Sequence, residues 1–208
     1  VRFYPRWNTG LAVTGDSSVS DFDFDYIVQY VNGRDGAEGN PYEEDSNTNK
    51  AVSGRFRINV RDDLRIGASL YVDRVSEEVG GVADENVSVT STGIQIEWFP
   101  EGHPGVEFEY VQGDLDFKLQ DDVDRWAYTF MVYQPIGTLT PYIRYEYLEP
   151  NDDVDDDEGT VTILGVNWMV DKNMYLKFEF DKFDTEDNNS KYEGDDFTEF
   201  KASLSVGF

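Results

Sequence analysis

The chain has no cysteine, one histidine and few basic residues, and each shortage excludes a class of function. Without cysteine there can be no disulfide framework, thiolate metal site or cysteine nucleophile. A lone histidine, His103, argues against histidine-based metal centres and Ser-His-Asp catalysis, so we expect neither an enzyme nor a cofactor. With 17 Lys and Arg against 43 Asp and Glu, the formal charge is −26, which excludes nucleic-acid binding through a basic face.

Long apolar runs are also missing. The longest has four residues, 130–133, whereas a membrane-spanning helix needs about 20. Aromatic residues nevertheless make up 15% of the chain, and acidic disordered segments are poor in them. The chain therefore folds, and its 208 residues suit one domain, which we expect over residues 1–208.

The apolar residues recur with a period of two, which is the period of a β-strand. At the end of the chain, for example, Phe200, Ala202 and Leu204 alternate with small or polar residues. No stretch shows helical spacing. We expect about eleven strands, at residues 9–15, 21–32, 50–60, 64–75, 89–99, 105–112, 124–136, 139–149, 160–170, 174–183 and 197–208.

The connections alternate between short and long along the whole chain. The long polar ones fall at residues 33–49, 76–88, 113–123, 150–160 and 184–197. This alternation is typical of outer-membrane barrels, which have short periplasmic turns and long external loops. A sheet in lipid must close into a barrel, with its apolar face toward acyl chains and its polar face lining the lumen. We therefore predict an all-β, transmembrane antiparallel up-and-down β-barrel in a bacterial outer membrane. A soluble lipocalin-like barrel or a β-sandwich is the alternative.

The chain ends in Phe208, on the last alternating strand. A terminal Phe resembles the C-terminal assembly signal of outer-membrane barrels, which implies that Phe208 lies at the periplasmic rim. Eleven is an odd number, while bacterial single-chain barrels have even numbers of strands. We therefore expect this sequence to lack N-terminal strands of a larger barrel.

Three short motifs resemble the phosphate-selective porin O/P superfamily: Tyr-Ile-Val-Gln-Tyr-Val-Asn-Gly at 26–33, Lys-Ala-Val-Ser-Gly-Arg at 50–55, and Leu-Arg-Ile-Gly-Ala-Ser at 64–69. The resemblance covers residues 9–75 and the last strand. It implies a C-terminal portion of a barrel of about 16–18 strands, often trimeric. Phosphate-selective members line their constriction with Lys and Arg. This chain has an acidic excess instead, so we expect weak cation preference.

The residues predicted to line the pore are the charged ones on the polar face: Arg55, Arg57, Arg65, Glu97, Glu107, Glu109, Arg144, Glu146, Lys177 and Glu179. Basic and acidic residues occupy neighbouring sectors. They could produce a transverse field that orients solutes in a water-filled channel. Alternatively, they could neutralise one another as cross-strand ion pairs that only stabilise the wall.

The segment 150–159 carries six acids in ten residues. They form a weak Ca²⁺ candidate, because Ca²⁺ prefers carboxylate oxygens, but their spacing does not match an EF-hand loop. The favoured alternative is a solvated loop. The candidate ligands are Asp152, Asp153, Asp155, Asp156, Asp157 and Glu158.

These features predict a porin-like channel for passive diffusion of small hydrophilic solutes or ions. The expected partners are outer-membrane lipid, two further copies in a homotrimer, and a protein partner at the loops or lumen. Two alternatives remain: a structural barrel that sheathes or anchors a partner protein, and a soluble carbohydrate-binding β-sandwich.

Overall fold

A computed structural model describes residues 3, 9–20, 22–33, 49–79, 82–118, 121–186 and 196–207. Phe208 lies outside these residues, as does most of the predicted loop 33–49. The described chain forms one antiparallel sheet in which every strand pairs with the next in sequence. The strands are β1 (Gly10–Val19), β2 (Phe22–Val31), β3 (Ala51–Arg61), β4 (Leu64–Val79), β5 (Val82–Trp98), β6 (Gly105–Asp116), β7 (Val123–Tyr133), β8 (Leu139–Glu149), β9 (Gly159–Asp171), β10 (Met174–Thr185) and β11 (Phe197–Val206).

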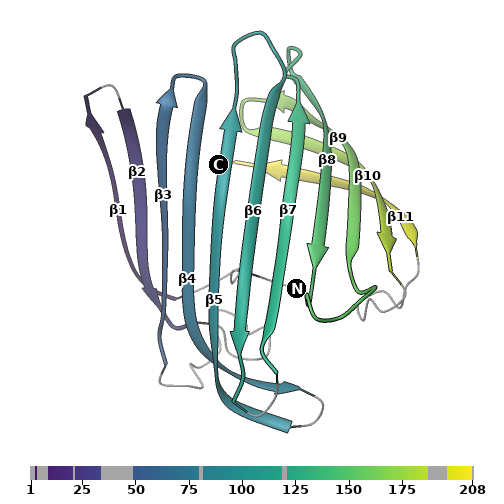
Figure 1. The fold of residues 1–208 in the computed structure, drawn as a ribbon. Coiled ribbons are helices and arrows are strands. Elements are labelled where there is room, and N and C mark those ends of the chain that lie inside the picture. The colour runs from purple at the N-terminus through teal and green to yellow at the C-terminus, as the bar shows by residue number, and fades with distance from the viewer. Residues whose placement is uncertain are drawn as a thin grey trace.

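The sheet is strongly curved. In Figure 1, β11 passes behind β6, β7 and β8, so the convex face is turned toward the viewer. The sheet is not closed, because β1 pairs only with β2, and β11 only with β10, among the described residues. No helix in the described part of the chain is long and apolar enough to cross a membrane. The predicted up-and-down arrangement of eleven strands is confirmed.

Short and long connections fall at opposite ends of the sheet, as predicted. One end has the short turns 20–21, 62–63, 99–104, 134–138 and 172–173, and the other has the connections 32–50, 80–81, 117–122, 150–158 and 186–196. Two connections depart from this pattern: the β6–β7 connection has six residues, as many as the turn 99–104, and the β4–β5 connection has only two. The predicted loop at 76–88 is wrong, because β4 and β5 continue as a paired hairpin almost to its tip. Their pairing shifts register between Val75 and Ser76, and beyond that point both strands bend beneath β6 and β7 (Figure 1).

A small apolar cluster on the concave face explains why the hairpin continues. Tyr71, Val75, Val87 and Val89 are almost completely buried and pack with Leu115. Alternation alone marked this face as polar, so the cluster was not expected. Its packing stabilises the hairpin near the point where the strands bend, and it narrows the concave side at the loop end of the sheet.

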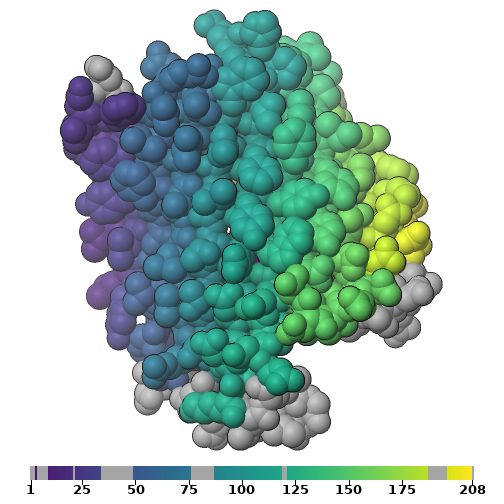
Figure 2. All heavy atoms as spheres, in the orientation of Figure 1, coloured from purple at the N-terminus to yellow at the C-terminus, as the bar shows by residue number. Residues whose placement is uncertain are grey.

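The two faces of the sheet differ as the alternation predicts. Large apolar side chains on the convex face are exposed, including Leu11 at 77%, Ile94 at 51% and Phe200 at 68%. Side chains cover this face from β3 to β8 in Figure 2. A soluble β-sandwich would bury such a face against a second sheet. The described residues form a single sheet, so the β-sandwich alternative is wrong.

Candidate functional site

All ten predicted pore-lining residues lie on the concave face. The strand register shows this directly, since Arg65 is opposite Glu97, and Glu97 is opposite Glu107. Directly opposed residues of neighbouring strands point to the same face of a sheet. The same relation connects the remaining residues through β3, β6, β7, β8, β9 and β10. The concave face is therefore a continuous charged wall with three sectors.

The first sector is formed by β2, β3 and β4, and its arginines are mostly paired. Arg57 contacts both carboxylate oxygens of Asp25 across the strands, with N–O distances of 3.0–3.1 Å. Arg65 contacts Glu97 at 3.1 Å and also donates a hydrogen bond to Asn59. Arg55 is exposed and makes no ion pair with another described residue. Most of the basic charge of this sector is thus locally neutralised.

The second sector, on β5 to β8, has an excess of carboxylates. A shallow cavity of about 270 Å³ opens here, and its polar lining residues are Gln95, Glu107, Glu109, Thr129, Arg144 and Glu146. Arg144 Nε lies 2.8 Å from Glu146 Oε1, close enough for an ion pair although not aligned as a hydrogen bond. Glu107 and Glu109 lie on the same wall with no ion pair to another described residue. This sector therefore carries net negative charge.

The third sector, on β8 to β11, is nearly balanced. Glu179 receives a hydrogen bond from the Tyr142 hydroxyl at 2.6 Å and an ion pair from Lys177 at 2.8 Å. Lys201 contacts the fully buried Asp181 at 2.7 Å. The predicted list omitted Lys201 and Tyr142. Both residues occupy polar-face positions in the two-residue period of their strands, and this period was the signal in the sequence that could have identified them. The sequence did not reveal their cross-strand partners.

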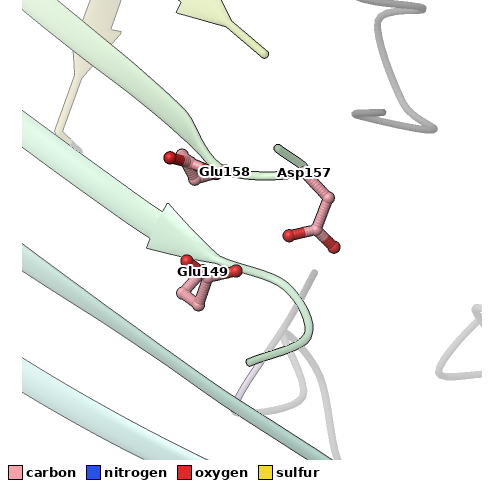
Figure 3. A group of neighbouring side chains, drawn as sticks. All are labelled: Glu149, Asp157 and Glu158. Carbon is pink, nitrogen blue, oxygen red and sulfur yellow. The ribbon is translucent and has the colours of Figure 1, made fainter. Parts of the chain in front are cut away.

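The candidate Ca²⁺ ligands of the segment 150–158 separate into two groups. Asp152, Asp153, Asp155 and Asp156 are exposed. Asp157 and Glu158 instead lie beside Glu149, the last residue of β8, and one carboxylate oxygen from each lies within 4.8 Å of the other two (Figure 3). Burial and the nearby charge of Glu158 raise the pKa of Asp157. Glu149 was not predicted, because it belongs to a strand rather than to the acidic run.

Aromatic side chains gather near both ends of the strands on the convex face. Trp126 stacks on Tyr147 at 4.8 Å near the loop end, and Trp168 lies opposite Leu139 near the turn end. Tyr147 and Leu139 are eight residues apart on β8, or about 27 Å at 3.4 Å per residue. A tilt of about 40° reduces this to about 21 Å, near the roughly 25 Å apolar band of membrane barrels.

An up-and-down antiparallel sheet with an apolar convex face between aromatic belts and a charged concave face defines part of an outer-membrane β-barrel. Residues 83–208, more than half of the chain, match the family described as phosphate-selective porin O and P. The chain belongs to this family and is a protein of the bacterial outer membrane. The match lies C-terminal to the three motifs at 26–69 on which the resemblance was based.

Solved structures show the same fold at low sequence identity. OmpT, an outer membrane protein of Vibrio cholerae, is 16% identical with a TM-score of 0.63 over 94% of this chain and 63% of its own. An anion-selective porin from Comamonas acidovorans is 13% identical with a TM-score of 0.61, over 94% of this chain and 57% of its own. The chain thus spans about three fifths of these porins. A comparison with curated proteins finds no match.

Proposed function

We propose that the concave face lines a water-filled channel through which small hydrophilic solutes or ions diffuse passively across the outer membrane. One observation carries the proposal: the strands present exposed apolar side chains to the convex side, whereas all ten of the predicted charged residues lie on the concave side. Such a sheet suits lipid outside and water inside. The proposed role needs no enzymatic chemistry, and the histidine His103 lies in an exposed short turn.

Closure of the channel requires partners for the free edges of β1 and β11. Unpaired backbone groups in hydrocarbon each cost several kcal/mol, so both edges must be paired in the membrane. We propose that further strands complete a larger barrel. The similar OmpT structure includes a trimer form, at 16% identity and a TM-score of 0.58 over 93% of this chain and 61% of its own. By analogy we propose a homotrimer in contact with outer-membrane lipid.

The charge pattern favours weak cation preference over phosphate selectivity. Arg57 and Arg65 are engaged by carboxylates, so Arg55 is the one arginine of the three without an ion pair to another described residue. Glu107 and Glu109 outnumber it and add negative charge to the cavity wall. Anion selectivity, as in the Comamonas porin, would require free basic residues at the constriction. The two arginines are therefore better suited to stabilising the wall than to attracting phosphate.

Reversal-potential measurements on the complete protein in a planar bilayer test this proposal. We expect weak cation preference at low salt, which decreases as salt screens charges over about 10 Å at 0.1 M. Glu107→Gln with Glu109→Gln should reduce the preference, while Asp153→Asn on the external loop should change it less. Anion preference that persists at 1 M salt would contradict the selectivity argument. Absence of any conductance by folded protein would favour the barrel that sheathes a partner.

A further inference from the structure

A cluster of carboxylates lies outside the proposed channel, where the end of β8 meets the loop that follows it. Glu149, on the convex face, ends β8, and the loop 150–158 returns so that Asp157 and Glu158 face it (Figure 3). Asp156 has a left-handed backbone with φ of 62°, a conformation that Asp adopts more readily than most residues. This turn reverses the chain and brings Asp157 into a buried position, 8% exposed.

The loop is held in this position by backbone hydrogen bonds. The amide of Asp152 donates to Asp124 on β7, the amide of Val154 donates to Asn151, and the amide of Glu186 donates to the carbonyl of Glu158. Strand β7 and the residue that follows β10 thus hold the loop at its two ends. The carboxylates are therefore positioned by the fold and not simply by their abundance in the sequence.

The side chain of Glu149 is the second observation that points to a bound cation. It is only 9% exposed. Its Oε2 accepts a hydrogen bond from the Tyr147 hydroxyl at 3.0 Å, but Oε1 is buried and receives no hydrogen bond from the described residues. A buried carboxylate oxygen without a donor is costly unless a cation compensates it. The neighbouring Asp157 carboxyl could satisfy Oε1 only by holding a proton, and a cation bound between the two carboxylates takes the place of that proton.

We propose that Glu149, Asp157 and Glu158 form a divalent-cation site, and that the ion it takes is Ca²⁺. Their carboxylate oxygens lie within 4.8 Å of one another, and oxygens on opposite sides of Ca²⁺ are about 4.6–5.2 Å apart. Mg²⁺ requires shorter bonds and near-ideal octahedral geometry, and it retains several waters. The ion links the end of β8 to the loop 150–158 and stabilises that loop. The site does not depend on conduction through the barrel.

Terbium luminescence tests the site, because Tb³⁺ replaces Ca²⁺ at oxygen-rich sites and is excited through a nearby aromatic ring. Tyr147, which donates to Glu149, and Trp126, which stacks on Tyr147, supply that excitation. With the complete protein folded in detergent, we expect saturable luminescence that Ca²⁺ displaces at lower concentration than Mg²⁺. Trp126→Phe should weaken the signal without changing the Ca²⁺ concentration needed for displacement.

Two variants and a matched control distinguish a Ca²⁺ site formed by specific ligands from general attraction of Ca²⁺ to an acidic loop. Glu149→Gln and Asp157→Asn should each weaken Ca²⁺ binding at least about tenfold, because each removes a charged ligand. Asp153→Asn removes the same charge from an exposed position of the same loop and should change binding less than about twofold. Equal weakening by all three variants would overturn the proposal, as would luminescence that Ca²⁺ does not displace. Heat-modifiable gel mobility verifies folding, and Glu158→Gln replaces any variant that does not fold.

Discussion

Placing an arginine on the lipid face tests the assignment of the two faces most directly. Ile94 on β5 is 51% exposed on the convex face, opposite Ala68 and Tyr110. It lies four residues from Trp98 in the belt near the short turns, which is about 14 Å along the strand and, with a tilt of about 40°, about 10 Å into the apolar band. Ile94 is therefore close to the midplane of the membrane.

Ile94→Arg should lower the free energy of unfolding by roughly 2–4 kcal/mol, the cost of an arginine on the lipid face at the midplane. The folding equilibrium constant should then decrease about 30- to 700-fold. The matched control is Gln95→Arg. Gln95 is the next residue, faces the concave side and donates a hydrogen bond to Glu97, so an arginine there meets carboxylates and water.

Reversible urea unfolding in lipid vesicles measures both variants of the complete protein. A loss for Ile94→Arg several times larger than that for Gln95→Arg is the expected result. Similar losses for the two variants would refute the assignment of faces, because the substitutions lie at the same depth and differ in the face they occupy. A larger loss of unfolding free energy for Gln95→Arg would mean that the concave, polar face is the one in contact with lipid.

Three further predictions concern the wall and the topology. Lys201→Met leaves the buried carboxylate of Asp181 without its ion pair, so unfolding experiments should show a loss of roughly 1–3 kcal/mol. Gly165→Ala places a methyl group in direct conflict with the Tyr142 ring. It should cost about 1–3 kcal/mol, and unchanged stability would show that the ring does not cover the glycine. A tag at Asp155 should be labelled on intact cells, whereas a tag in a short turn at the other end should not. Labelling of both would contradict the orientation.

The sequence alone determined which face of each strand is polar. Side chains of a strand alternate between its two faces whatever the strand pairs with. Counting every second residue along β3 or β6 was therefore sufficient to assign Arg57 and Glu109 to the polar face. The strands themselves followed from the same period, as did the alternation of short and long connections. These features depend only on local chain geometry, and they were sufficient to predict an outer-membrane barrel.

Only the tertiary structure decided which residues meet. Register gives Arg57 its partner Asp25. It also places Leu204 opposite Leu176, which pairs with Trp168, so Leu204 lies level with an aromatic belt. Contacts of this kind depend on packing between distant segments, which a local period does not encode. The β4–β5 hairpin continues through its predicted loop for the same reason. The left-handed turn likewise brings Asp157 to the end of β8, a contact that the sequence did not predict. The folded loop joins residues whose separation in the sequence says nothing about their distance in space.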